Sequence, residues 1–414
     1  MSVRFFHTSD WHLGQYFYNH SRYYEHQQFL DWLIVQIEAQ QPDALLIAGD
    51  IFDVINPAAQ AQKQLYQFLA DAHRVAPHLQ TLMIAGNHDS GYRIEQVQPL
   101  LDKYRAKAIG VIQRNAEQAL DLDSLLQPIY NREQHIVAWC LALPYLRPAE
   151  ITSAHEQCRH SQDAIAYLHQ QLIAAARQRQ QAGQALILMS HAHMQGGESS
   201  DSERPIIIGH EEALSISLFD DLIDYVALGH LHKPQIVQQR HIRYSGSPIP
   251  LSFSEVKYQH QVLDVSIDPT EKDPEQRLKL TRLAIPRSVP LQRIQGELQE
   301  VLQQLQQLPQ GEPLPLEQRC YLDIEYHSLR PPQLNLRQQF EDLLPEDRYR
   351  LLRIVRKYPQ QQSNTESFEQ QLLLEAPTPD KLFQQLWQQQ GYQADPDVEQ
   401  DFASLVIEAQ QALS

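Results

Sequence analysis

Short apolar runs, each about as long as a buried strand, recur through the first 250 residues of the chain. They are Val3–Phe6, Ala44–Ala48, Thr81–Ala85, Ile136–Leu143, Ala185–Met189 and Tyr225–Leu228. A later strand is expected at His241–Tyr244. Longer stretches with helical spacing, such as Tyr24–Ala39 and Gln60–Ala72, lie between several of these runs. Buried strands that alternate with helices predict an α/β domain whose sheet faces are covered by helices.

The pattern changes after Asp268–Arg277, a charged stretch with a proline that is typical of a linker. Apolar residues then recur at helical spacing in a glutamine-rich background and predict one amphipathic helix: Leu291, Ile294, Leu298, Val301, Leu302, Leu305 and Leu308. Apolar residues that alternate at Leu322, Ile324 and Tyr326 predict a strand, and a second strand is expected at Tyr349–Val355. Together these elements predict a small α+β module.

Lys381–Ser414 has the pattern of two short helices broken at Gly391–Pro396. Their apolar patches either pack against the preceding module or bind a partner, and periodicity cannot decide between the two. The chain is therefore expected to contain an α/β domain over residues 1–267, an α+β module over residues 285–375 and C-terminal helices over residues 380–414.

Composition narrows the class of protein. Hydrophobic residues make up 42% and charged residues 21%, as in an ordinary globular protein. The first residues lack the basic and apolar regions of a signal peptide, so we expect no secretory signal. The sequence has no apolar run of membrane-spanning length and holds three widely spaced cysteines. We expect a cytoplasmic protein with reduced thiols and no membrane contact. The formal charge of −17 argues against a nucleic-acid partner, although bound cations would neutralise part of it and a local basic patch remains compatible.

Residues that can bind a metal ion follow five of the predicted strands. They are Asp10 and His12 after the first strand, Asp50 after ALLIAG, Asn87, His88 and Asp89 after TLMIAG, His191 after ALILMS, and His230 and His232 after YVALG. Open α/β sheets build their sites outside the carboxyl ends of their strands. We therefore expect these side chains to meet at one edge of the sheet.

The residue types indicate two metal ions. Carboxylate, imidazole and amide oxygen together suit Mn²⁺, Fe or Zn²⁺, whereas a magnesium site holds mostly oxygen ligands. Seven ligands are too many for one tetrahedral ion, but they suit two ions that share a carboxylate and act together in phosphoryl transfer. Turn geometry or a close backbone approach would explain the glycines at positions 49, 86 and 229. Other histidines, including His7, His20, His26 and His193, are expected to be structural.

The motifs DWH, GDIFD, GNHD, SH and GHLH, in this order, resemble the calcineurin-like metallophosphoesterase superfamily. Within it, YSGSPIPLSFSE after GHLH and the SERPIIIG stretch look like the bacterial SbcD family, whose members are nuclease subunits. The resemblance implies a β-sandwich flanked by helices, a small capping domain and a C-terminal helical hairpin. It covers nearly the whole chain.

The resemblance also implies roles for individual residues. One metal ion would be held by Asp10, His12, Asp50 and His232, and the other by Asn87, His191 and His230 with Asp50 bridging. His88 would be the catalytic acid, a role that suits an imidazole because its pKa lies near neutrality. Asp53 would orient His88, with a helix or turn cap as the alternative role.

The SbcD family further implies manganese as the activating metal, with Mg²⁺ as the alternative, and no ATP site in the chain itself. ATP would bind an SbcC-like ATPase partner, in agreement with the lack of a GxxxxGK[ST] motif here. The implied activities are 3′–5′ exonuclease action on double-stranded DNA ends and endonuclease cleavage of single strands and hairpins, in DNA repair, recombination and replication. Two nuclease subunits would pair within a heterotetramer.

Two other functions stay open at this level. A phosphatase or nucleotide phosphodiesterase would use the same metal site, although GDIFDVIN lacks the arginine of the GDxxDRG form. A scaffold subunit with an inactive site is the second alternative, and the complete ligand set gives it no support. Basic residues at Arg348, Arg350, Arg353, Arg356 and Lys357 either contact DNA or form a solvated strand face.

Overall fold

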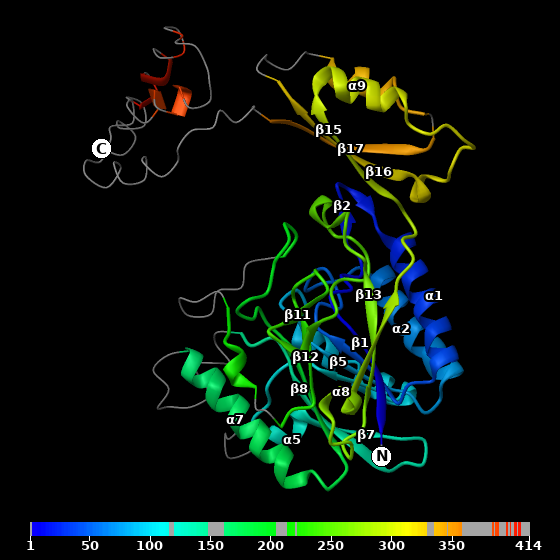
Figure 1. The fold of residues 1–414 in the computed structure, drawn as a ribbon, viewed down its shortest axis with the longest axis vertical. Helices are drawn as coiled ribbons and strands as arrows, with labels where there is room; N and C mark the ends of the chain where they lie inside the picture. The colour runs from blue at the N-terminus through cyan, green and yellow to red at the C-terminus, as the bar shows by residue number, and fades with distance from the viewer. Residues whose placement is uncertain are drawn as a thin grey trace. The chain divides into compact units, whose positions relative to one another are not determined.

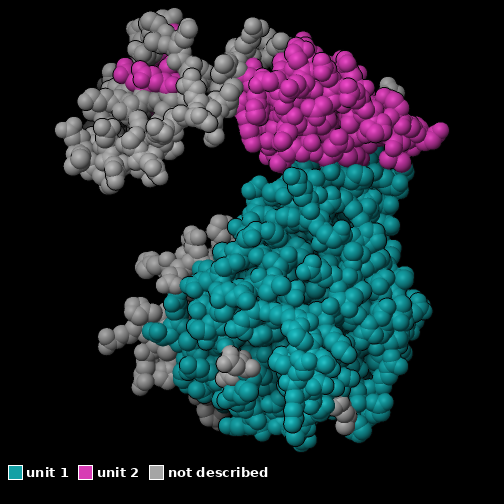
Figure 2. All heavy atoms as spheres, viewed as in Figure 1, with its two compact units in different colours: residues 1–291, 315–319 teal, residues 292–314, 320–414 magenta. Residues whose placement is uncertain are grey.

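The structure is a computed structural model of the chain. It describes residues 2–115, 120–147, 161–203, 213–219, 222–328, 335–345 and 347–357, together with a few short runs beyond residue 382. The chain divides into two compact units, shown in different colours in Figure 2. Unit 1 contains residues 1–291 and 315–319, and unit 2 contains residues 292–314 and 320–414.

Unit 1 is built on two six-stranded sheets. The first has the strand order β14 (Leu278–Ala284), β13 (Gln261–Ile267), β1 (Val3–Thr8), β4 (Ala44–Ala48), β5 (Gln80–Ile84) and β6 (Ala106–Ile109). Strands β1, β4, β5 and β6 are parallel, whereas β13 and β14 are antiparallel additions at one edge. The parallel strands therefore end at a common edge.

The second sheet has the strand order β11 (Gln235–Val237), β12 (Gln239–Tyr244), β10 (Tyr225–Gly229), β9 (Ala185–His191), β8 (Ile136–Leu143) and β7 (Leu126–Tyr130). Its four central strands, β12, β10, β9 and β8, are parallel. The predicted apolar runs therefore correspond to strands of the two sheets, and the prediction of an α/β fold is confirmed.

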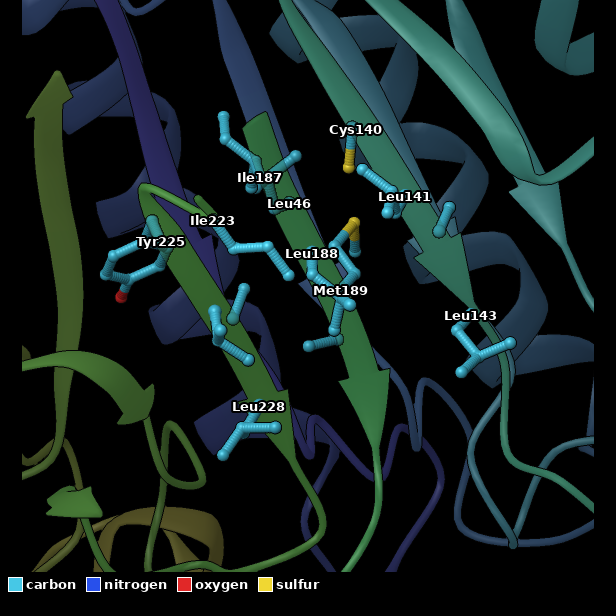
Figure 3. Close-up of a cluster of buried hydrophobic side chains, with 14 of the residues drawn as sticks. Leu46, Cys140, Leu141, Leu143, Ile187, Leu188, Met189, Ile223, Tyr225 and Leu228 are labelled. Atoms are coloured by element: carbon cyan, nitrogen blue, oxygen red, sulfur yellow. The ribbon is translucent and has the colours of Figure 1, made fainter. Parts of the chain in front are cut away.

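The strands are apolar on both faces because one face packs against the other sheet and the other face packs against helices. Leu46 of β4 and Leu188 of β9 belong to one buried cluster, part of which Figure 3 shows in close-up. Leu45 and Ile47, on either side of Leu46 in the chain, point to the other face of the sheet. They belong to a second cluster with α1 (Tyr23–Gln40) and α2 (Ala59–Val75). Helix α7 (Ser161–Arg179), labelled in Figure 1, adds its buried residues to the first cluster. Strands covered on both sides are expected to lack polar alternation.

Two predicted elements differ in the structure. The segment Asp268–Arg277, expected to be a linker, joins β13 to β14 within the first sheet and contains the short helix α8 (Pro274–Arg277). Unit 1 therefore continues to residue 291 instead of ending at 267. The charged turn of a β-hairpin has the same composition as an interdomain linker, and composition cannot distinguish the two.

The predicted single helix over residues 291–308 is a strand followed by a helix, β15 (Leu291–Glu297) and α9 (Leu298–Gln306). A capping box between Glu297 and Glu300 starts the helix. Leu291 and Ile294 are buried on the strand, so their spacing matches the helical period by coincidence.

Unit 2 forms a three-stranded sheet in the order β15, β16 (Cys320–His327) and β17 (Tyr349–Lys357). Val301 and Leu305 of α9 and Phe340 of α10 (Leu336–Glu341) complete its core. Most of the segment 380–414 lies outside the described residues, but the ring of Phe383 stacks on that of Phe402 with centroids 4.0 Å apart. The two predicted apolar patches of this segment therefore touch each other. None of the helices in the described part of the chain is long and apolar enough to cross a membrane.

Candidate metal centre

The predicted ligand residues lie at or shortly beyond the carboxyl ends of five strands, β1, β4, β5, β9 and β10, with His191 the last residue of β9. Among the described residues, three groups have ligand atoms that all lie within 4.8 Å of one another. These groups are Asp10 with His12 and His232, His12 with Asp50 and His88, and Asp50 with His191 and His230. Asn87 joins them, because its Oδ1 lies 3.0 Å from Nε2 of His191.

Asp50 lies at the centre of the cluster. Its Oδ2 is 3.6 Å from Nε2 of His12 and 3.4 Å from Nε2 of His191, whereas its Oδ1 accepts a hydrogen bond from the main-chain N–H of His88 at 2.8 Å. One oxygen thus faces both imidazole groups while the other holds the loop that carries His88. Burial would raise the pKa of Asp50, but the surrounding imidazoles, with His191 first, hold it well below its ordinary value.

The main chain is unusual at four of the ligand positions. Asp10, His12, Asp50 and His230 have φ angles of 55°, 47°, 49° and 107°, in the left-handed region that non-glycine residues rarely adopt. Each such residue costs on the order of 1–3 kcal/mol, and conformations of this kind cluster at functional sites. Main-chain hydrogen bonds hold the strained loops together. The N–H of Asp10 donates to the carbonyl oxygen of Gly49, and the N–H of His12 donates to the carbonyl oxygen of Asp50.

The glycines before the ligands are required for close approach. A Cβ atom at Gly49, which has φ +90°, would lie 2.1 Å from Nδ1 of His191. A Cβ atom at Gly86 would lie 2.1 Å from Oδ1 of Asp50, and one at Gly229 would lie 1.8 Å from the carbonyl oxygen of Ala48. Close approach therefore explains all three glycines, and left-handed turn geometry contributes only at Gly49.

The buried histidines of the cluster fit a cation. Both ring nitrogens of His12 are buried and face the carboxylates of Asp53 and Asp50 at 3.2 and 3.6 Å without the alignment of a hydrogen bond, and the residue is 3% exposed. Burial opposes a charge on His191 and His232, yet nearby carboxylates raise the pKa of each to about 9. Such a site attracts positive charge strongly. An imidazole binds a metal ion only when it is neutral, so a divalent cation entering here would displace a proton.

Hydrogen bonds to the outer ring nitrogens decide which nitrogen faces the cluster. Nδ1 of His191 donates to the carbonyl oxygen of Ala48 at 2.9 Å, because a carbonyl can only accept. Nδ1 of His232 lies 2.6 Å from Oγ of Ser202 and 3.4 Å from Oε1 of Glu255. Both rings thereby direct Nε2 inward. Metal-binding histidines commonly use such an outer contact to fix the tautomer and the ring orientation.

His88 and Asp53 are in contact, but through the main chain. Nδ1 of His88 donates to the backbone carbonyl oxygen of Asp53 at 2.7 Å. The Asp53 carboxylate instead places Oδ1 3.2 Å from Nδ1 of His12. The motif predicts an orienting contact from Asp53 to His88 without specifying the atom that makes it. A motif records only side chains, so it cannot reveal that the carbonyl of the same residue makes the contact.

Four residues that position the ligands have no role assigned to them from the sequence, although Asp89 is among the metal-capable residues expected at this edge. Asp89, the last residue of GNHD, accepts hydrogen bonds from the N–H groups of Ile51, Phe52 and Gly86, and so ties two ligand loops together. Around His232 the others are Ser202, Glu203 and Glu255. The position of Asp89 next to His88 is a usable signal. Glu255 ends the stretch YSGSPIPLSFSE that follows GHLH, but no spacing in the sequence predicts its contact with His232, 23 residues away.

The remaining candidates have structural environments. His7 is fully buried, with Nδ1 2.9 Å from the hydroxyl of Tyr225 and Nε2 3.2 Å from the carbonyl oxygen of Leu228. His26 is also buried, on α1. The ring of His193 lies 6.2 Å from that of His230 and belongs to none of the three ligand groups of described residues. Cys140 and Cys320 are buried free thiols, and Cys158 lies outside the described residues.

In unit 2, two of the basic residues on β17 pair with carboxylates of β16, and a third stacks on an aromatic ring. Arg353 contacts Asp323 at 2.7 Å, and Lys357 contacts Glu325 at 2.8 Å. The guanidinium of Arg350 lies over the ring of Tyr321, 4.1 Å from its centroid. These contacts favour a structural role for the basic strand face over a DNA contact.

Comparison with known proteins agrees with this geometry. Residues 3–234 match the model of the calcineurin-like phosphoesterase family, and residues 287–391 match a family described as the type 5 capsule protein repressor C-terminal domain. The chain belongs to the calcineurin-like phosphoesterases, which are hydrolases of phosphate esters.

Within that class, the relatives point to one family. The SbcD component of the SbcCD nuclease from Rhodobacter capsulatus is 37% identical over 317 residues, which cover 74% of this chain and 76% of that protein. The SbcD protein of Escherichia coli is 33% identical, covering 78% of each chain, and that of Bacillus subtilis is 32% identical, covering 65% and 68%. The chain therefore belongs to the SbcD family.

Proposed function

We propose that this chain is the metal-dependent nuclease subunit of an SbcCD-type complex and hydrolyses phosphodiester bonds in DNA. The observation that carries the proposal is that seven ligand-type side chains and His88 come together at the ends of five strands, in a chain of the SbcD family. No observation specifically favours the alternative of a phosphatase or nucleotide phosphodiesterase.

Two divalent cations would be held by two overlapping sets of residues. Asp10, His12, Asp50 and His232 form one set, and Asp50, Asn87, His191 and His230 form the other. The position of Asp50 Oδ2 between His12 and His191 supports a bridging role. When bound, such cations supply the charge that holds a phosphodiester and lowers the pKa of an attacking water. The mixture of imidazoles and carboxylates favours Mn²⁺ over Mg²⁺.

His88 is the residue proposed to move a proton. Its Nδ1–H is committed to the Asp53 carbonyl, so Nε2 is the ring atom left to give a proton to the leaving oxygen. The bond from the His88 N–H to Asp50 fixes this loop against the central carboxylate. His88 is 6% exposed, a position that suits a group at the boundary between buried ligands and substrate.

The proposed assembly follows the family. An SbcC-like ATPase would bind ATP and contact the C-terminal segment after residue 380, most of which lies outside the described residues. Two copies of this chain would pair in a heterotetramer, residues 285–375 would form the capping module, and the substrates would be double-strand ends, hairpins and single strands in the cytoplasm. The relatives are themselves components of SbcCD nucleases, which supports an assembly of this kind.

The deciding experiment uses the purified full-length chain. Labelled single-stranded and hairpin DNA are incubated with Mn²⁺, with Mg²⁺ and with EDTA, and an SbcC-type ATPase with ATP is added in a parallel series with double-stranded ends. We expect Mn²⁺-dependent cleavage of single strands and hairpins by the chain alone, and ATP-dependent shortening of duplex ends with the ATPase. Hydrolysis of a phosphoserine peptide with no cleavage of any DNA would reject the proposal in favour of a phosphatase.

A further inference from the structure

A basic cavity lies at the open edge of the sandwich in unit 1. It has a volume of about 280 Å³ and is lined from both sheets, by Gln235 and Arg243 of β11 and β12 and by Gln261 and Arg282 of β13 and β14. Lys233 and Lys257 complete its charged lining, and none of the described residues that line it carries a carboxylate. A pocket lined by four cations is unexpected on a chain with a formal charge of −17.

These cations are poorly neutralised by the protein. Lys233 pairs with Glu198. Arg243, Lys257 and Arg282 form no ion pair with any residue that the structure describes. Elsewhere on the same strands and their connections, Arg240 pairs with Glu275 and Arg277 with Asp224, whereas the exposed Lys279 of β14 has no ion-pair partner among the described residues.

Arg243 carries the strongest signal. It is only 7% exposed, and its Nε donates to the carbonyl oxygen of Arg240 at 2.8 Å. Burial lowers the pKa of Arg243, and the nearby cations Arg282 and Arg240 act in the same direction. A buried charge without an opposite partner is costly, and an anion bound in the cavity would relieve that cost.

A second cavity continues the first. It has a volume of about 600 Å³ and shares Lys257 and Tyr258 with its neighbour. It adds Arg287, whose guanidinium donates to the carbonyl oxygens of Val256 and Tyr258 at 2.8 and 3.1 Å. Its one lining carboxylate among the described residues, Glu25, is already held by Arg22 at 2.6 Å.

The two cavities adjoin the segment that carries a metal-ligand candidate. Lys233 follows His232 directly in the chain, and the carbonyl oxygen of His232 accepts a hydrogen bond from the N–H of Ser247 at 3.2 Å. The wall of the basic cavity and the edge of the metal centre therefore belong to one continuous loop. A ligand that extends away from the metal centre along this loop would reach the cations.

We propose that the two adjoining cavities form a groove that binds the sugar–phosphate backbone of a nucleic-acid strand beside the metal centre. Phosphates would contact Arg243, Arg282 and Lys257, and the ring of Tyr258 offers a surface for a base or sugar. Cations interleaved with an aromatic side chain are the usual surface for single strands, because every base can stack and every phosphate carries charge. The inference rests on the proposed nuclease function and identifies where its substrate lies.

The test compares a double variant with a matched control. Lys257→Gln with Arg282→Gln removes two of the cations, and Arg282 lies on the exposed part of β14, so the fold should persist. Lys279→Gln removes an exposed cation of the same strand that does not line either cavity. Binding of a labelled single-stranded oligonucleotide is measured by anisotropy in EDTA over a range of salt concentrations, and thermal unfolding checks each fold.

We expect the double variant to bind DNA about tenfold more weakly at low salt. The slope of log K against log salt should fall by about 1.4, since each lost phosphate contact on a single strand contributes about 0.7. The control should bind like the wild type. Turnover of bis(p-nitrophenyl) phosphate should not change in either variant, because so small a diester does not reach the groove.

Unchanged DNA affinity and salt slope in the double variant would contradict the proposal that the groove binds DNA. So would a loss of inorganic phosphate binding with DNA binding intact, because that result would make the cavity a site for a free anion. Failure of the wild type to cut any DNA is a separate outcome and counts against the proposed function itself.

Discussion

The carboxylate of Glu255 lies 3.4 Å from Nδ1 of His232, and the hydroxyl of Ser202 contacts both. Glu255 has no exposed surface, and its Oε2 also accepts a hydrogen bond from the N–H of Leu251 at 2.9 Å. A buried carboxylate thus stands behind an imidazole whose other nitrogen faces the metal centre. Contact with His232 keeps the pKa of Glu255 at about 2, although burial alone would raise it.

Glu255→Gln should weaken metal binding. Glutamine preserves the shape of the side chain but removes the negative charge that favours a proton on Nδ1 and a free electron pair on Nε2. Loss of such an outer contact typically costs about 10–100-fold in metal affinity. Titration calorimetry with Mn²⁺ on the EDTA-treated chain measures the change, and Glu133→Gln, an exposed carboxylate, is the control. Wild-type affinity in the Glu255 variant would show that this carboxylate is only structural.

His88→Ala should keep the metals and lose most cleavage. The His88 ring shares a ligand group with His12 and Asp50 but is proposed to act on the leaving oxygen, which contributes about 10²–10⁴-fold in general acid catalysis. Metal content and DNA cleavage are measured together. The defect should shrink with a p-nitrophenyl leaving group, which needs no proton. Cleavage of DNA at the wild-type rate would contradict the acid role.

Asp53→Asn separates the carboxylate of Asp53 from its carbonyl. The substitution leaves the main-chain contact to His88 in place and changes only the group 3.2 Å from Nδ1 of His12. We expect Mn²⁺ affinity to fall by about tenfold, while kcat at saturating Mn²⁺ stays near that of the wild type. A loss of kcat as large as that of His88→Ala would show that the carboxylate itself orients the acid.

The sequence predicts the core of the fold and the cluster because both depend on strands. Ala44–Ala48 and Tyr225–Leu228 are apolar on both faces, which leaves few alternatives to a buried strand, and parallel strands bring the residues after them to one edge. The ligand residues Asp50 and His230 can be found in this way without knowledge of any distance.

The features that sequence reasoning misses depend on tertiary contacts or on the main chain. Glu255 reaches His232 only because the SFSE turn folds back on the GHLH loop, and no periodicity encodes that approach. The hairpin turn at Asp268–Arg277 can be distinguished from a linker only by the pairing of β13 with β14. Leu291 and Ile294 have the i, i+3 spacing of a helix, which places them on opposite faces of the strand that actually forms, and only the sheet pairing of the folded chain decides the outcome.

Gly86→Ala should disrupt the metal centre. The added Cβ would lie 2.1 Å from Oδ1 and 2.3 Å from the main-chain nitrogen of Asp50, so the central carboxylate or the loop has to move. We expect loss of Mn²⁺ binding and destabilisation by about 1–3 kcal/mol, the usual range for overpacking. Gly183→Ala is the control: it has φ +83° but meets no atom closer than 3.7 Å. It should cost only about 1–2 kcal/mol of backbone strain and leave Mn²⁺ binding intact.

Acid should destabilise the metal-free chain partly through His7. Burial lowers the pKa of His7 to about 3, compared with 6.5 in the unfolded chain. Above pH 6.5 the ring is neutral in both states. As the pH falls from 6.5 towards 3, only the unfolded chain gains the proton, so the free energy of unfolding falls by up to about 1.4 kcal/mol per pH unit.

His7→Gln isolates this contribution. Glutamine can still accept from the Tyr225 hydroxyl and donate to the Leu228 carbonyl, the two partners of the native ring, but it does not titrate. Urea denaturation between pH 7.5 and 5, with EDTA present, should give a shallower pH dependence for the variant than for the wild type. Equal slopes would mean that His7 takes up a proton in the folded chain as readily as in the unfolded one. That result would contradict the lowered pKa expected for this fully buried ring.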